Sequence, residues 1–267
     1  MSNWTKYFNG KRVWVTGASS GIGKALVEAL GEAGVSTVAS ARRADRLSKL
    51  AERYECVRAL PMDITDFEAS DEMATRAWDL LGGLDILINN AGASHRFLFA
   101  EAEPEAIQRI IDVNLAGPMH LSRAVVARML AAGGGHLVTI TSLAARIQTP
   151  QRTVYTAAKM ALHGLFDSLR GEVEPHGVAI TLVAPGFVRT EISESAVTAD
   201  GDAYGMTGEQ HARGMPPDLC AQRILTGVAS RRREFSVAVT PLLRYAAFVR
   251  RYLPWLYFRL IAKAKVT

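Results

Sequence analysis

The segment KRVWVTGASSGIG, residues 11–23, decides the fold of this chain. Its first half is a β-branched and aromatic run that predicts a strand, and its second half, Gly17 to Gly23, is a glycine-rich turn. Residues 24–34 then place apolar side chains at helical spacing, and residues 35–41 return to a strand pattern. This strand–helix–strand unit is typical of parallel strands joined by a right-handed crossover.

The same alternation continues along the chain. It predicts helices near 43–53, 66–81, 103–131 and 152–174, and strands at 55–60, 84–89, 135–141 and 178–184. This order predicts a single α/β domain, a doubly wound parallel sheet with helices on both faces. Residues 187–217, rich in Thr, Ser, Gly and Glu, depart from the pattern, and we interpret them as a loop over a ligand site at the carboxyl ends of the strands.

The composition excludes several classes of protein. Of 267 residues, 49% are hydrophobic and 21% charged, which excludes a disordered chain, and no uncharged apolar run is long enough to span a bilayer. Cys56 and Cys220 are too few for a disulfide-rich secreted scaffold, and we interpret both as buried or inert thiols. Because the first residues have no charged-then-apolar leader, we expect a cytoplasmic protein.

The charge is unevenly distributed. Residues 221–267 hold ten Lys and Arg against one acid, Glu234, and carry +9, whereas the first 220 residues carry −4. The net charge of +5 therefore comes from the C-terminal segment. Its basic run at 231–233 lacks a nucleic-acid recognition motif, and we expect a solvated face and no nucleic-acid partner.

The glycine-rich turn predicts a dinucleotide site, because backbone N–H groups and the start of a helix can approach a pyrophosphate there. The spacing of Gly17, Gly21 and Gly23 is wider than the usual fingerprint, and glycines that only pack a helix on a strand are the alternative. Where an NAD site has an acid, this chain has Arg42 and Arg43.

The arginine pair favours NADP(H), since guanidinium groups bind a 2′-phosphate and a carboxylate would repel it. We expect Arg42 to be the main contact, and a solvated pair that opens a helix is the alternative. Asp63, after the third strand, is expected either to accept a hydrogen bond from the adenine amino group or to cap the following helix.

Tyr155 and Lys159 are the candidate catalytic pair, four residues apart on a predicted helix and so on one face. An ammonium beside the phenol is expected to lower the pKa of Tyr155 and suit it to general acid or base catalysis. Ser142, at the end of a strand, is expected to hold a substrate oxygen, and Asn114 to anchor a water between Lys159 and solvent. Ordinary helix packing is the alternative for Asn114.

These residues together resemble the short-chain dehydrogenase/reductase family. Similar motifs, in the family's order and spacing over residues 10–190, are TGASSGIG at 16–23, NNAG at 89–92, Asn114, Ser142, Tyr155-x-x-x-Lys159 and Pro185-Gly186. The resemblance implies a seven-stranded Rossmann sheet in the order 3-2-1-4-5-6-7, with a last strand at 235–239. Ala145 and Ala158 depart from residues common in the family, and neither departure removes a reacting group.

The resemblance also implies roles. Tyr155 would exchange the substrate proton, Lys159 would also bind the nicotinamide ribose, Ser142 would orient the substrate and Asn114 would support a proton relay. The full set of expected cofactor residues is Gly17, Ser19, Ser20, Gly21, Ile22, Gly23, Arg42, Arg43, Asp63, Asn90, Ala91, Gly92, Tyr155, Lys159, Pro185, Gly186 and Thr190.

Residues 189–205 and the C-terminus most resemble a branch of the family that includes membrane-associated reductases. The resemblance implies an NADPH-dependent reductase of a lipophilic ketone or aldehyde, acting as a homodimer or homotetramer. The alternatives are an NAD-dependent alcohol or hydroxysteroid dehydrogenase and a non-catalytic, cofactor-sensing scaffold at a membrane. The expected substrate residues are Ser142, His95, Phe187, Tyr204 and Met206, with simple packing as the alternative reading of the last four. The histidines lack metal-ligand spacing, so we expect no metal.

Residues 241–267 form a basic, aromatic extension of the catalytic domain, which we expect to span 1–240. Pro241 and Pro254 predict two short helices there. Apolar faces flanked by cations predict peripheral contact with an anionic membrane. A cover over the enzyme's own pocket and a subunit interface are the alternatives.

Overall fold

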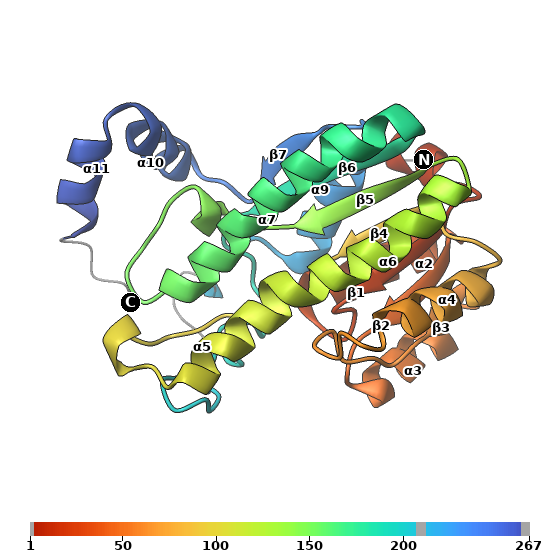
Figure 1. The fold of residues 1–267 in the computed structure, drawn as a ribbon, viewed down its shortest axis with the longest axis horizontal. Coiled ribbons are helices and arrows are strands. Elements are labelled where there is room, and N and C mark those ends of the chain that lie inside the picture. Colours follow the sequence, from red (N-terminus) through yellow and green to blue (C-terminus); the bar gives the residue numbers. More distant parts are fainter. Residues whose placement is uncertain (1–2, 207–211, 263–267) are drawn as a thin grey trace.

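The structure, a computed structural model, describes residues 3–206 and 212–262. Seven parallel strands form one sheet in the order β3-β2-β1-β4-β5-β6-β7, which confirms the predicted topology (Figure 1). The strands are β1 (Arg12–Thr16), β2 (Ser36–Ser40), β3 (Val57–Ala59), β4 (Ile86–Asn89), β5 (Gly135–Ile140), β6 (Val178–Pro185) and β7 (Glu234–Val237).

Helices cover both faces of the sheet (Figure 1). On one face, Leu26 and Ile224 belong to the core formed with α1 (Asn3–Phe8), α2 (Gly21–Glu32), α3 (Ala44–Arg53) and α9 (Pro217–Ala229). On the other face, Leu121 and Phe166 belong to the core formed with α4 (Ser70–Leu81), α6 (Gly117–Ala131) and α7 (Thr153–Val173). Helix α1 was not predicted, although Trp4 and Phe8 are buried in the first core.

The predicted helix 103–131 is not continuous. It is divided into α5 (Pro104–Ile111), a π-helical turn at Asp112–Ala116, and α6. Pro118 has no N–H to donate to the carbonyl of Asn114, so the regular hydrogen-bond ladder is interrupted here. The wide turn contains Asn114, whose Nδ2 donates to the Ile110 carbonyl at 2.9 Å.

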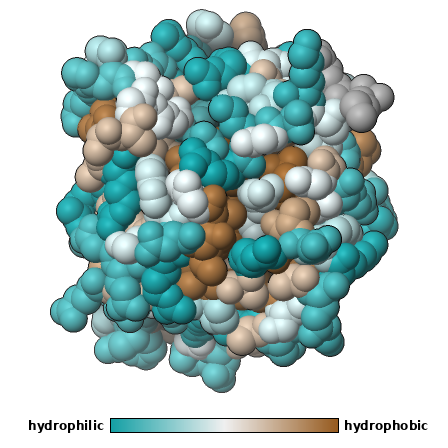
Figure 2. Space-filling model, turned by 90° about the vertical axis from the view of Figure 1, so that its right-hand side faces the viewer, coloured by the Kyte–Doolittle hydropathy of each residue, from teal (hydrophilic) through white to brown (hydrophobic). Residues whose placement is uncertain are grey.

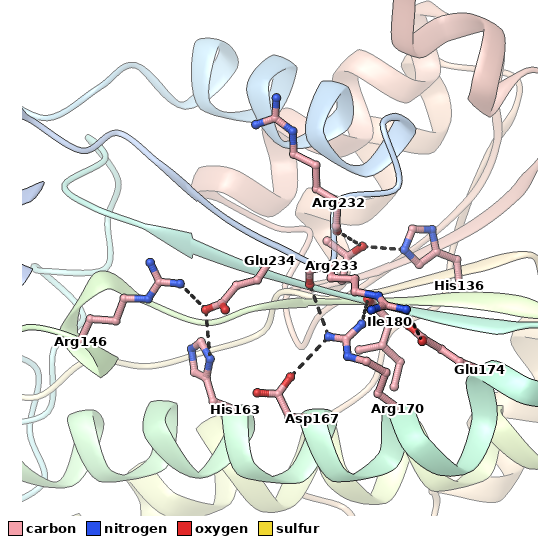
Figure 3. Close-up of polar contacts among 11 residues, drawn as sticks. His136, Arg146, His163, Asp167, Arg170, Glu174, Ile180, Arg232, Arg233 and Glu234 are labelled. Carbon is pink, nitrogen blue, oxygen red and sulfur yellow. Dashed lines mark hydrogen bonds and ion pairs between the residues drawn. The ribbon is translucent and has the colours of Figure 1, made fainter. Parts of the chain in front are cut away.

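A polar network joins α7 to the strands β6 and β7, and within it His163 Nδ1 of α7 lies 3.4 Å from Glu234 Oε1 of β7 (Figure 3). Arg170 donates to the carbonyl of Ile180 at 2.6 Å and pairs with Glu174 at 3.1 Å. Glu174 also pairs with Arg233 at 2.9 Å. Arg231 donates to the Tyr7 hydroxyl at 3.2 Å. Two arginines of the basic run therefore bind other parts of the chain.

The C-terminal segment forms α10 (Pro241–Tyr252) and α11 (Pro254–Ile261), which begin at the two predicted prolines. Val249 and Tyr257 pack on Leu143 and Ile147, which follow β5. The two helices therefore lie at the end of the molecule to which the strands point (Figure 1). The opposite side is mainly hydrophilic, with a narrow apolar band at its centre (Figure 2). Lys263 and Lys265 of the predicted basic tail lie outside the described residues, as do residues 207–211 of the predicted loop.

Candidate active site and cofactor cleft

A cavity of about 470 Å³ runs along the carboxyl ends of the strands. Parallel strands end at the same edge of the sheet, so the turns that follow β1, β2, β4, β5 and β6 meet there. Among the predicted residues the cavity is lined by Gly17, Ser19, Ser20, Gly21, Ile22, Arg42, Arg43, Asp63, Asn90, Ala91, Gly92, Asn114, Ser142, Tyr155, Lys159, Pro185, Gly186, Phe187 and Thr190.

The glycine turn needs its glycines for different reasons. Gly17 has φ +65°, and a Cβ there would come within 2.8 Å of the Cα of Ala91. Gly21 has φ +55° and faces Thr190 from the loop after β6. Gly23 does not line the cavity, and its Cβ would come within 2.8 Å of the Gly17 carbonyl carbon. Gly23 therefore lets α2 pack closely on the turn, which is the packing role weighed as the alternative.

Thr16 fixes the loop after β4 against this turn. Its Oγ1 accepts hydrogen bonds from the backbone N–H groups of Asn90, at 3.0 Å, and Ala91, at 3.1 Å. The Asn90 side chain donates to the Thr16 carbonyl at 3.0 Å. The family resemblance implied that this loop borders the cofactor, but it did not identify Thr16 as the residue that holds the loop.

Two arginines and two acids lie at the end of the cavity near β2. Arg43 donates through Nε to Ser19 Oγ at 3.0 Å and pairs with Glu191 at 3.1 Å. Arg42 is exposed, lines the cavity and has no hydrogen bond or ion pair to another described residue. Asp63 lines the cavity and also accepts a hydrogen bond from Thr65 N at 2.9 Å, so it closes a turn as well. Glu191 was not predicted from the sequence.

Tyr155 and Lys159 lie one turn apart on α7, with Lys159 Nζ 5.8 Å from the centroid of the Tyr155 ring. Nζ donates to the Ile140 carbonyl at 3.1 Å, and burial lowers the pKa of Lys159 to about 8. The expectation that the pKa of Tyr155 is lowered is wrong for this structure. Burial raises it, against the opposing effects of a hydrogen bond with Ser142 and the charge of Arg152.

Asn114 is buried and lies close to this pair. Its Nδ2 donates to the Ala93 carbonyl at 2.8 Å, and its Oδ1 accepts from Ala93 N at 3.3 Å. A Cβ at Gly92 would lie 3.0 Å from Asn114 Oδ1 and 3.5 Å from Lys159 Nζ. The π-helical turn therefore brings Asn114 to the same part of the cavity as Lys159.

Arg152 is a functional candidate that the sequence analysis missed. It lines the cavity three residues before Tyr155 and donates to the His95 carbonyl at 3.1 Å and to Ser94 Oγ. Positions three apart on a helix share a face, so the spacing alone offered a signal for Arg152.

Of the four predicted apolar or histidine pocket residues, only Phe187 lines the cavity. His95 is fully buried and stacks on Phe97, with ring centroids 3.9 Å apart. The guanidinium carbon of Arg96 lies over the ring of Tyr204, 5.0 Å from its centroid, and Met206 is exposed. The apolar wall comes instead from Leu143, Ile147, Val188, Ile192 and Leu243.

Replacing His95 by Phe is expected to reduce the acid sensitivity of folding. Both ring nitrogens of His95 are buried without hydrogen-bond partners, and burial, with the nearby Arg152 charge, lowers its pKa from 6.5 to about 4. The unfolded chain therefore takes up a proton below pH 6.5 that the folded chain excludes, so stability falls as the pH decreases.

For such a histidine the loss between pH 7 and pH 5 is about 2 kcal/mol. Urea unfolding of His95→Phe should show a correspondingly smaller decrease over this range than the parent chain. An unchanged pH dependence would contradict the buried, neutral state of His95.

Within residues 3–206 and 212–262, no three His, Cys, Asp or Glu side chains gather as metal ligands would. Burial raises the pKa of both thiols, that of buried Cys220 to about 12, which keeps them protonated.

The chain is similar to a known protein family and to individual proteins of it. Residues 11–201 match the family model of short chain dehydrogenases. The bovine protein named dehydrogenase/reductase SDR family member 7B is 34% identical over 96% of this chain and 82% of the relative. A Drosophila melanogaster protein named dehydrogenase/reductase SDR family protein 7-like is also 34% identical, over 96% of this chain and 81% of the relative.

Solved structures give the same picture. A short-chain dehydrogenase from Streptomyces avermitilis has a TM-score of 0.80 and 28% identity, covering 94% of both chains. One from Burkholderia cenocepacia, in complex with NADP, has a TM-score of 0.77 and 27% identity, covering 94% of this chain and 97% of its own. One from Burkholderia phymatum, in complex with NAD, shares the fold at 22% identity and a TM-score of 0.82, covering 94% of this chain and 96% of its own.

Proposed function

The chain belongs to the short-chain dehydrogenase/reductase family, and from this premise we propose that it reduces a lipophilic ketone or aldehyde with NADPH, using Tyr155 as the general acid. The observation that carries the proposal is that Ser142, Tyr155, Lys159 and Asn114 line the same cavity as the glycine turn. Gly17 and Gly21 line this cavity with positive φ and carry no side chain, so the backbone of the turn is accessible as a pyrophosphate site requires.

Each residue of the site has a task in this reaction. When bound, the nicotinamide cofactor supplies the hydride, and the protein supplies the proton. Ser142 holds the carbonyl oxygen, and the Tyr155 hydroxyl donates its proton to that oxygen. The raised pKa of Tyr155 keeps the phenol protonated at neutral pH, which suits the acid that a reduction requires. Asn114 holds the Ala93 backbone of the loop after β4, and Lys159 would bind the nicotinamide ribose.

Arg42 supports the preference for NADPH. It lines the cavity beside the end of β2, is exposed and has no acidic partner among the described residues, so it is available for a 2′-phosphate. Arg43 is shared among Ser19, Ser20 and Glu191, and we assign it a supporting part. An NAD-dependent dehydrogenase is the rival reading. A non-catalytic cofactor sensor is disfavoured because it would not need the complete catalytic set.

The apolar wall of Leu143, Ile147 and Leu243 supports a lipophilic substrate. The proposal is tested by following NADPH consumption with a panel of steroid, retinoid, quinone and long-chain keto-lipid carbonyls. We expect turnover with at least one class, and faster with NADPH than with NADH. Tight NADPH binding without turnover of any carbonyl would instead favour the cofactor sensor.

We also propose that α10 and α11 rest on an anionic lipid surface. Seven of their apolar side chains are at least half exposed: Leu242, Tyr245, Phe248, Tyr252, Trp255, Phe258 and Leu260. The charged residues of 241–262 are all arginines. A second copy seated on the same face would bring these like charges together, whereas an anionic bilayer complements them. In the described part of the chain, no helix is long and apolar enough to cross a bilayer.

Flotation of the whole chain with vesicles tests this surface. We expect binding to phosphatidylcholine vesicles that contain phosphatidylglycerol and little to phosphatidylcholine alone. Arg244→Gln with Arg259→Gln should weaken binding roughly 30-fold, since each cation near such a surface contributes about 1 kcal/mol. Arg53→Gln with Arg76→Gln removes the same charge from α3 and α4 and serves as the control. Equal binding of the two double variants would contradict the proposal.

A further inference from the structure

Arg152 places a positive charge at the catalytic end of the cavity. It directly precedes α7, and its side chain lines the cavity together with Tyr155 and Ser142. Tyr155 and Arg152 lie close enough for each to affect the pKa of the other. Across the described ranges, no carboxylate forms an ion pair with Arg152.

The hydrogen bonds of Arg152 leave most of its donors unused. Both protein bonds, to Ser94 Oγ and to the His95 carbonyl, are made by Nη1. The N–H groups of Nε and Nη2 have no hydrogen-bond acceptor among the residues described. Burial lowers the pKa of Arg152, and the positive charge of nearby Arg96 lowers it further. Burying a guanidinium without a counter-ion costs free energy, and an anion that binds to the guanidinium offsets this cost.

We propose that Arg152 binds an anionic oxygen group, a carboxylate or a phosphate, carried by the substrate whose carbonyl meets Ser142 and Tyr155. The planar guanidinium can hold such a group through two parallel N–H donors. The apolar remainder of the substrate would lie against Leu143, Ile147 and Leu243. The substrate is therefore an amphipathic ketone or aldehyde with one charged group, an inference that rests on the proposed function.

Calorimetric titration of the NADP⁺-loaded protein tests anion binding at Arg152 without turnover. Saturating NADP⁺ occupies the cofactor site, so the probes cannot bind at Arg42 and Arg43. The probes are decanoate, decyl phosphate and 1-decanol. We expect at least one anionic probe to bind roughly tenfold tighter than decanol, the gain of one charge-assisted hydrogen-bonded pair. The stronger of the two anions identifies the group as a carboxylate or a phosphate.

Arg152→Gln should remove the preference for the anion and leave decanol binding unchanged, while Arg152→Lys should keep part of it. Arg76→Gln, on the exposed surface of α4, is the control. Retained NADPH binding and melting temperature verify that each variant is folded.

Equal affinity of the parent protein for all three probes would overturn the proposal. An equal loss of affinity for all three probes in Arg152→Gln would also overturn it, because Arg152 would then only position the loop that contains Ser94 and His95. Failure of the proposed function gives a different result, since it would leave anion binding intact and no carbonyl reduced.

Discussion

Tyr155→Phe is expected to lower kcat for carbonyl reduction on the order of 10³-fold while changing the Kd for NADPH by less than about twofold. The substitution removes only the hydroxyl, which shares a hydrogen bond with Ser142. The aromatic ring remains to pack beside Val154 and Lys159. Steady-state kinetics and fluorescence titration of NADPH measure the two quantities separately.

Tyr252→Phe provides a matched control, because Tyr252 is exposed on α10 and outside the cavity lining. This variant should retain full activity. The reduction rate of the parent protein is also expected to fall at alkaline pH, because the proton donor must be protonated and the pKa of Tyr155 is raised. A Tyr155→Phe variant that keeps more than a tenth of the parent kcat would refute the assigned role.

Arg42→Asp should lower the preference for NADPH over NADH by about 100-fold. A charge-assisted hydrogen bond to phosphate contributes about 1.5–3 kcal/mol, and each 1.4 kcal/mol is a tenfold change in Kd. The new carboxylate would also repel the 2′-phosphate and accept a hydrogen bond from the 2′-hydroxyl of NADH. Because Arg42 is exposed and has no partner among the described residues, the change breaks no other contact. The ratio of the two Kd values is the measurement.

Glu191→Gln should move the same ratio in the opposite direction, by a few-fold. The Glu191 carboxylate pairs with Arg43 at 3.1 Å and with Arg46 at 2.9 Å, both at an exposed site where ion pairs are weak. Removing its charge frees Arg43 for the phosphate. If neither substitution changes the ratio by more than about threefold, the NADP preference does not come from this end of the cavity.

Local patterns located six of the seven strands, and the family resemblance supplied the last strand and the strand order. Each of the predicted strands falls on an observed one, because a buried parallel strand is recognisable from its β-branched run and the turn that follows. Two helix predictions failed, one because the local signal of Pro118 was not used and one because the cause was non-local. The interruption at Asp112–Ala116 depends on Pro118 and on the bonds of Asn114 to Ala93 and Ile110. Helix α1 is stabilised by burying Trp4 and Phe8 against distant residues of α9.

The site was predictable in its motifs but not in its electrostatics. Motif spacing placed Ser142, Tyr155 and Lys159 in one cavity, because strand ends and helix periodicity fix those positions. The pKa of Tyr155 depends on how deeply its hydroxyl is buried, which spacing does not reveal. The partners of Arg152 and Glu191 are supplied by loops far away in sequence, and so their roles required the folded chain.

The most direct test of the central claim is to follow a deuteride. The protein is incubated with NADPH deuterated at the transferring position of the nicotinamide and with a carbonyl substrate from the panel, and the alcohol is examined by mass spectrometry. We expect one deuterium on the former carbonyl carbon, and a rate of formation about 10³-fold lower with Tyr155→Phe. An alcohol without deuterium, or one formed equally fast by Tyr155→Phe, would contradict this claim.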